Sequence, residues 1–177
     1  MYINFWYPIC KGDELTNATP VRVDLLGLPF VAFRDSRCAA HVLADTCVHR
    51  GGSLSKGKVQ GDCLECPYHG WRFGGDGRCV LIPSLGDKTP PARAKVDSYP
   101  VQEQYGMVFA FLGDLPAAER PPVCPVPEYG QDGWRASEIA VLNISCYYER
   151  SMENGLDPVH NEFVHPLQGA PMMSPEQ

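Results

Sequence analysis

Apolar and polar residues alternate in short runs through residues 1–113, and turn-forming residues separate the runs. The runs VRVDLLG and LPFVAFR flank Gly27, which predicts a β-hairpin. HVLAD at 41–45 predicts a further strand, and the segment 96–113, interrupted at Tyr105-Gly106, predicts two more. This rhythm is typical of a small domain built almost entirely from β-strands.

The pattern changes at residues 116–133, PAAERPPVCPVPEYGQDG, which hold five prolines and two glycines. Proline fixes φ and lacks a backbone donor, so neither a helix nor a central strand is expected there. We predict that this segment is a linker between a first domain, 1–115, and the start of a second, 134–177. Directly after the linker, SEIAVLNISCYY at 137–148 predicts a strand.

Residues 148–165 have helical periodicity. Apolar residues recur at spacings of four, four, three and four, namely Tyr148, Met152, Leu156, Val159 and Phe163. Four polar residues fall within an arc of about 140° on the opposite side: Asn154, Asp157, His160 and His165. Pro158 predicts a break at Asp157, with Asp157 capping a second helical turn. The second domain therefore begins with a strand and a broken helix.

The composition and net charge of the chain argue against several classes of protein function. The chain is 44% hydrophobic and 20% charged, as in soluble globular proteins, and its net charge of −6 without a Lys/Arg block argues against nucleic-acid binding. No apolar run is long enough to cross a bilayer, and MYINFWYPIC lacks the features of a secretory signal. We therefore expect a cytoplasmic protein without a membrane partner, in which cysteines bind metal more often than they form disulfides.

Two short segments, CVHRG and CPYHGW, carry the strongest chemical signal. They supply Cys47 and His49, then sixteen intervening residues, then Cys66 and His69. Zinc sites usually pair cysteines two to four residues apart, so Cys-x-His fits zinc poorly. The set suits a [2Fe–2S] cluster with the two thiolates on one iron and the two imidazoles on the other, because neutral ligands raise the reduction potential. Structural zinc is the alternative.

This double motif resembles the signature of Rieske proteins, which implies a small antiparallel β-sandwich with two cluster-binding loops. Gly51, Gly52 and Gly70 would let the loop backbone approach the bridging sulfides. Respiratory Rieske subunits carry an additional cysteine in each loop, whereas Gly52 and Tyr68 stand at these positions here. The sequence is thus similar to the low-potential Rieske domains of oxygenases and ferredoxins.

The other six cysteines are interpreted as small apolar residues rather than ligands, although two of them, Cys63 and Cys79, lie close to the motif in sequence. They are Cys10, Cys38, Cys63, Cys79, Cys124 and Cys146.

The spacing Asn154-x2-Asp157-x2-His160-x4-His165 is weak evidence by itself, because an aspartate cap and two polar-face histidines would also explain it. After a Rieske motif, however, it resembles the catalytic α subunit of Rieske non-haem iron oxygenases. That resemblance implies an α+β catalytic domain in which His160 and His165 bind mononuclear Fe(II) together with a later aspartate.

The resemblance also assigns roles beyond the ligands. Asp157 would connect the iron histidines to His69 of a neighbouring subunit in a head-to-tail homotrimer, and Asn154 would lie near the iron. Electrons would come from a ferredoxin or flavin reductase, and O2 would hydroxylate or oxidatively demethylate an aromatic or other organic substrate. The chain would be the N-terminal half of such a subunit.

No acid after His165 is placed to complete this iron site, since PLQGAPMMSPEQ contains only Glu176. We therefore expect the 177-residue chain to have no oxygenase activity by itself. The alternative function is a Rieske ferredoxin, an electron carrier without its own catalytic iron, which would leave residues 134–177 unexplained.

Overall fold

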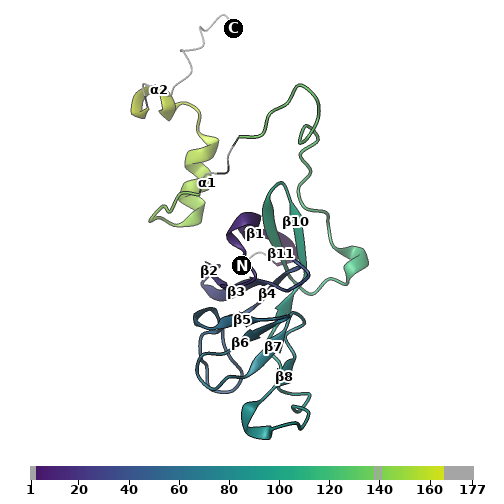
Figure 1. Cartoon of the computed structure of the whole chain (residues 1–177). Helices are drawn as coiled ribbons and strands as arrows, with labels where there is room; N and C mark the ends of the chain where they lie inside the picture. The colour runs from purple at the N-terminus through teal and green to yellow at the C-terminus, as the bar shows by residue number, and fades with distance from the viewer. Residues whose placement is uncertain (1–2, 138, 140, 166–177) are drawn as a thin grey trace, which may run out of the picture. The chain divides into compact units, whose positions relative to one another are not determined.

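The structure is a computed structural model that describes residues 3–137, 139 and 141–165 (Figure 1). The chain folds as two compact units, Met1–Ala136 and Ser137–Gln177. The domain boundaries at 115 and 134 stay predictions.

The first unit is built from antiparallel strands, as expected for a mainly β domain. They form three sheets, with strand orders β1-β11-β10, β2-β3-β4-β9 and β5-β6-β7-β8. The strands are β1 (Phe5–Lys11), β2 (Val21–Leu25), β3 (Leu28–Arg34), β4 (Ala40–Ala44), β5 (Lys58–Gln60), β6 (Cys63–Glu65), β7 (Arg72–Gly74), β8 (Cys79–Leu81), β9 (Ser98–Tyr99), β10 (Val101–Gln104) and β11 (Met107–Leu112).

Two of the predicted strand pairs are tight hairpins. Leu26 and Gly27 join β2 to β3 with φ of 54° and 75°, and Tyr105 and Gly106 join β10 to β11 with φ of 56° and 76°. Two successive residues with positive φ make a type I′ turn, whose twist matches that of the flanking strands. The predicted hairpin around Gly27 and the strands on either side of Tyr105-Gly106 are confirmed.

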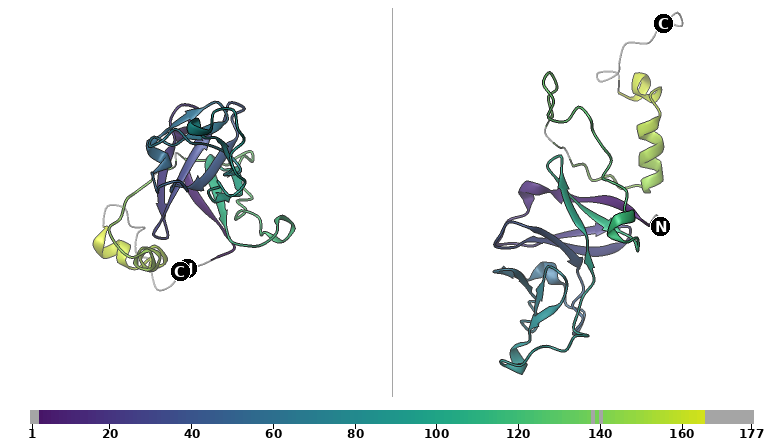
Figure 2. Two further views of the ribbon diagram at one scale, coloured as in Figure 1. Left: turned by 90° about the horizontal axis from the view of Figure 1, so that it is seen from below. Right: turned by 90° about the vertical axis from the view of Figure 1, so that its right-hand side faces the viewer.

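The central sheet lies between two apolar cores. In β3, Val31 and Phe33 belong to one core, and Phe30 and Ala32 belong to the other. All four are buried because successive side chains of a strand point to opposite faces, and here both faces are covered. The β5–β8 sheet contributes to the first core and lies at one end of this unit, with β1, β10 and β11 at the other end (Figures 1 and 2).

Residues from the proline-rich segment pack on this unit. The indole N–H of Trp6 donates to the carbonyl of Pro121 at 2.6 Å, and the side chain of Val123 is buried. The hydroxyl of Tyr105 accepts the backbone N–H of Val126 at 2.8 Å. The first part of the predicted linker is therefore ordered against the β-strands.

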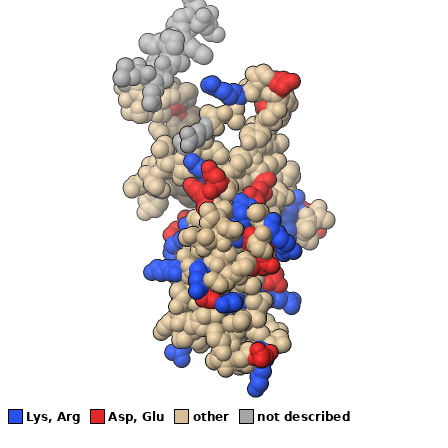
Figure 3. Space-filling model, viewed as in Figure 1, with Lys and Arg blue, Asp and Glu red and all other residues tan. Residues whose placement is uncertain are grey.

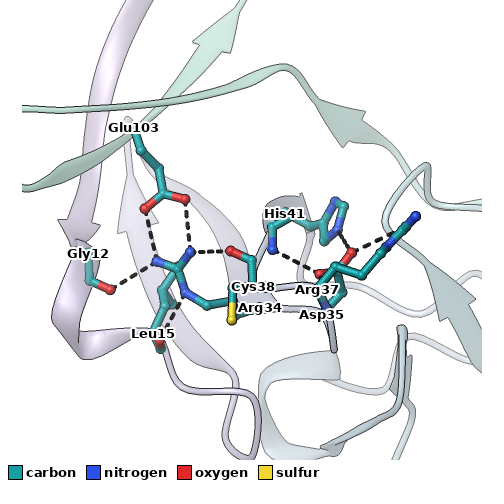
Figure 4. Close-up of polar contacts among 9 residues, drawn as sticks. Gly12, Leu15, Arg34, Asp35, Arg37, Cys38, His41 and Glu103 are labelled. Carbon is teal, nitrogen blue, oxygen red and sulfur yellow. Dashed lines mark hydrogen bonds and ion pairs between the residues drawn. The ribbon is translucent and has the colours of Figure 1, made fainter.

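Two charged residues at the end of β3 anchor neighbouring segments (Figure 4). Arg34 donates two hydrogen bonds to the carboxylate of Glu103, at 2.8 and 2.9 Å. Asp35 is buried and bonds to the ring of His41 at 3.1 Å. This hydrogen bond, with two from backbone N–H groups, lowers the pKa of Asp35 to about 2. Elsewhere on the β-rich unit, basic and acidic side chains are intermixed on the face shown in Figure 3.

The second unit contains helices α1 (Tyr148–Leu156) and α2 (His160–Val164). The strand predicted at 137–148 is wrong, since none of the residues described in that segment is in a strand. Val141, Leu142 and Ile144 are 62%, 79% and 62% exposed. A strand needs a partner for its backbone groups, and no described segment pairs with this one.

The predicted helix break is confirmed. α1 ends at Leu156, and Asp157 accepts the backbone N–H of Val159 on its Oδ1 atom at 2.9 Å. The apolar stripe is exposed in this unit: Tyr148, Met152, Leu156, Val159 and Phe163. In the part of the chain that is described, neither helix has the length or hydrophobicity to cross a membrane.

Substitution of Gly57 would test how closely the backbone at this position packs against β6. A Cβ atom there would clash with the backbone carbonyl oxygen of Glu65, whereas a Cβ atom at Gly61 would meet nothing within 4 Å. We expect Gly57→Ala to lower the free energy of unfolding by about 3 kcal/mol. Gly61→Ala, strained only by its φ of 63°, should cost about 1 kcal/mol. Denaturant titration of both variants measures this difference, and equal losses would contradict the clash.

Candidate metal centres

The first cysteine–histidine loop follows β4 and is closed by its own backbone. The N–H of Cys47 donates to the carbonyl of Gly52 at 2.9 Å, and the N–H of Gly51 donates to the carbonyl of Cys47 at 2.9 Å. Gly51 has a φ of 67°, which favours glycine, and nothing lies within 4 Å of its added Cβ. The loop thus requires a glycine at position 51 for its turn.

The second loop, between β6 and β7, repeats the same two bonds. The N–H of Cys66 donates to the carbonyl of Trp71 at 2.8 Å, and the N–H of Gly70 donates to the carbonyl of Cys66 at 3.0 Å. Gly70 also has a positive φ, 70°. In both loops the glycine four residues after the cysteine therefore turns the chain back.

The two loops lie against each other with their thiols inside. A Cβ atom on Gly52 would lie 3.3 Å from the Sγ atom of Cys66, and both Cys47 and Cys66 are 2% exposed. Burial, together with the neighbouring Cys66 thiol, raises the pKa of Cys47 to about 11, while backbone N–H groups of His49 and Arg50 favour the thiolate. A bound metal would displace both protons and supply the missing positive charge.

The imidazoles of the two loops are neighbours nearer the surface. The rings of His49 and His69 lie 4.6 Å apart, and His49 stacks on Trp71 at 4.5 Å with an interplanar angle of 4°. Desolvation, followed by the charges of His69 and Arg50, lowers the pKa of His49, which favours the neutral, metal-binding form. Trp71 is the last residue of CPYHGW, and the sequence pattern predicted no role for it, although an aromatic residue inside the segment was a signal.

The four donors fit a two-metal cluster better than a single ion. The thiols are buried together and the imidazoles lie together towards solvent, with His69 exposed. Throughout the described residues, no three His, Cys, Asp or Glu side chains converge on one metal position. Tetrahedral zinc would need all four donors around one point, whereas a [2Fe–2S] cluster takes two thiolates on one iron and two imidazoles on the other.

In the second unit, two hydrogen bonds fix the orientation and the tautomer of the His160 ring. Its Nδ1 atom lies 2.6 Å from the backbone carbonyl of Asp157, which can only accept, so Nδ1 carries the proton. Its Nε2 atom then accepts from the side-chain amide of Asn154 at 3.1 Å. His160 is therefore held as the tautomer whose Nε2 lone pair can bind a metal.

The ring of His165 lies close to the ring of His160 because α2 ends at Val164. The backbone of His165 is no longer helical, with φ −123° and ψ 60°, and its ring lies 5.6 Å from that of His160. An open pocket of about 510 Å³ is lined by Asn154, Gly155, Leu156, Asp157, Pro158, His160, Asn161 and His165. The structure thus brings the four predicted residues together, with two imidazoles as potential ligands and no third ligand among the described residues.

Comparisons with known proteins agree with this geometry. The family model for the Rieske [2Fe-2S] domain matches residues 5–100. The oxygenase subunit of 3-chlorobenzoate-3,4-dioxygenase from Comamonas testosteroni is 35% identical over 91% of this chain, which spans 37% of that protein. NdmA from Pseudomonas putida CBB5 has a solved structure with a TM-score of 0.78 and 28% identity, covering 98% of this chain and 52% of its own.

A dicamba monooxygenase solved with non-heme iron and dicamba is 33% identical, with a TM-score of 0.60, covering 67% of this chain and 37% of its own. The first unit is thus a Rieske domain, the class that carries a [2Fe–2S] cluster. The chain belongs to the Rieske [2Fe–2S] domain family. Its relatives include proteins named as oxygenase subunits and oxygenase components, and one structural neighbour was solved with non-heme iron. It spans between 24% and 46% of the length of the curated relatives that it matches.

Proposed function

We propose that Cys47, His49, Cys66 and His69 are the ligands of the [2Fe–2S] cluster. The observation that carries this assignment is the pair of matched loops, which bury two thiols and hold two imidazoles 4.6 Å apart. The cluster, when bound, accepts and passes on one electron at a time. The chain's own part is to keep the thiols from water and to leave the edge of His69 at the surface, where an electron can leave.

We propose further that His160 and His165 supply two of the three protein ligands of the mononuclear iron, in a second domain that begins at residue 134. The tautomer fixed by Asp157 and the ring distance of 5.6 Å support this role. Iron bound at the Nε2 atom of His160 would displace the Asn154 amide from that lone pair, so Asn154 would lie near the iron without being a ligand. The third ligand would be a carboxylate outside the described residues.

The whole protein would then be the terminal oxygenase component of a Rieske non-haem iron oxygenase. Its electrons would come from a ferredoxin or flavin reductase in the cytoplasm, and O2 would hydroxylate or demethylate an aromatic or other small organic molecule. In a head-to-tail homotrimer, Asp157 of one subunit would connect its iron histidines to His69 of the next. Relatives named as oxygenase subunits and components support a system of several proteins.

A Rieske ferredoxin is the second candidate, favoured by the family match, which ends at residue 100. It would leave the histidine pair in the second unit without a role. Against it stands the similarity to oxygenase components over 91% to 93% of the chain, which includes that pair's unit.

Iron and sulfide analysis of the purified protein separates the two candidates. In the whole protein, which would supply the third ligand, we expect three irons for every two acid-labile sulfides, because one iron would belong to the histidine pair and two to the cluster. Two irons for two sulfides, with full cluster absorbance, would favour the electron carrier. Zinc without sulfide would contradict both.

A further inference from the structure

Asp45 is a buried carboxylate at the base of the first cluster loop. It lies two residues before Cys47, and its side chain is 0% exposed. Its Oδ2 atom accepts three hydrogen bonds, from Arg22 Nη1 at 2.8 Å, Ser53 Oγ at 2.7 Å and Ser55 Oγ at 2.8 Å. Its Oδ1 atom accepts the backbone N–H of Ser55 at 2.5 Å. A buried charge this fully bonded is held in one position.

These bonds join the two ends of the loop. Asp45 precedes the loop in sequence, whereas Ser53 and Ser55 follow it. Three of the four hydrogen bonds therefore cross the base of the loop. The backbone adds the bond from Leu54 N–H to the carbonyl of Asp45 at 3.2 Å and one isolated bridge between Thr46 and Ser53. The carboxylate thus adds three side-chain hydrogen bonds to the backbone closure of this loop.

The second loop has the same two backbone bonds, but its base is built differently. It is the tip of a hairpin, and Glu65 pairs with Arg72 in the ladder of β6 and β7. The Glu65 carboxylate also accepts Arg72 Nε at 2.7 Å, but its side chain keeps 16% exposure. The first loop has no such strand pair at its base, because β4 leads into it and a 3-10 turn, Leu54–Lys56, follows it. At the base of the first loop, the Asp45 carboxylate therefore supplements a single isolated bridge, whereas a strand ladder holds the base of the second loop.

We propose that Asp45 is a positioning residue for the cluster. It would hold the first loop closed so that Cys47 and His49 stay opposite Cys66 and His69, and its negative charge lowers the reduction potential. This inference rests on the ligand assignment proposed above and extends it to a residue outside the ligand set.

Asparagine cannot replace this carboxylate, even though it has the same shape. Its amide nitrogen donates, so in one orientation it faces Arg22 Nη1 and in the other it faces the backbone N–H of Ser55. Neither donor can rotate away as a hydroxyl can. Asp45→Asn therefore leaves a buried donor without an acceptor in addition to removing a charge.

The experiment compares cluster retention and reduction potential in the purified holoprotein. Visible absorbance follows cluster loss in the presence of an iron chelator, and a redox titration gives the potential. We expect Asp45→Asn to lose its cluster about tenfold faster than the wild type and to have a higher potential. Asp35→Asn is the matched control, since Asp35 is equally buried and bonds to Arg37, Ala39 and His41 instead of a cluster loop. It should leave the loss rate within about twofold and the potential unchanged.

Ser53→Ala is the milder variant, which keeps the charge and removes one donor. We expect cluster loss about threefold faster at an unchanged potential, and this variant decides the matter if Asp45→Asn does not fold. Wild-type loss rates in the variants would overturn the inference, and so would equal changes in Asp35→Asn and Asp45→Asn, which would indicate general destabilisation. A wild-type protein without cluster absorbance would instead contradict the proposed function.

Discussion

Replacing Cys66 by serine should remove the [2Fe–2S] cluster. The thiol of Cys66 is 2% exposed and lies in the interface between the two loops, so neither water nor another side chain can take its place on the iron. A serine hydroxyl ionises far less readily than a thiol and is a poor ligand for this soft site. We expect iron and acid-labile sulfide to fall at least about tenfold, with loss of the visible absorbance.

Two other cysteines serve as controls for this substitution. Cys63 lies on β6, half-buried, and Cys79 lies on β8, where its thiol donates to the carbonyl of Leu81 at 3.3 Å. A serine at position 79 can keep that hydrogen bond. Cys63→Ser and Cys79→Ser should therefore retain the wild-type iron and sulfide content. A cluster lost from either control, or kept in Cys66→Ser, would show that the ligand assignment is wrong.

The cluster loops could be predicted from sequence because their information is local. Cys47 and His49 are two residues apart, and the glycines that turn each loop stand at fixed offsets from its cysteine. The approach of one loop to the other, with Gly52 against the thiol of Cys66, depends on the packing of the sheets instead. The resemblance to Rieske proteins supplied that step.

Asp45 shows what local patterns leave out. Asp45 is the one acid in DTCVHRG and one of 21 acidic residues in the chain, and such residues usually lie at the surface. One of its partners, Arg22, is 23 positions away in β2, and two others, Ser53 and Ser55, lie beyond the loop. Trp71 was missed for a similar reason, since its stacking partner His49 belongs to the other loop.

The second unit shows where a pattern fails. SEIAVLNISCYY has the composition of a strand, yet strand formation requires a pairing partner that the pattern does not contain. The histidines show the opposite case. On an ideal helix His160 and His165 point about 140° apart, and their approach arises from the end of α2 at Val164, which spacing alone could not predict.

Replacing His160 by alanine should remove the mononuclear iron and leave the cluster in place. The His160 ring is largely buried and held at both nitrogens, by Asn154 and by the carbonyl of Asp157. Without it, His165 is the one imidazole left among the described residues that line the pocket. We expect one iron fewer per chain, two irons and two sulfides retained, an unchanged cluster spectrum, and at least about a hundredfold weaker Fe(II) binding.

Asn161→Ala is the matched control, because Asn161 lines the same pocket on α2 but is exposed, and it hydrogen-bonds through its backbone. Alanine is also a better helix former than asparagine, so the helix should not weaken. This variant should keep the wild-type iron content. Iron loss in both variants would indicate that iron binding depends on the folded state of the pocket and not on the His160 ring in particular. Full iron content in His160→Ala would exclude the histidine pair as the iron site. Because the two proposed ligand sets lie in separate units, the independence of cluster and iron content is the result that would distinguish an oxygenase component from an electron carrier.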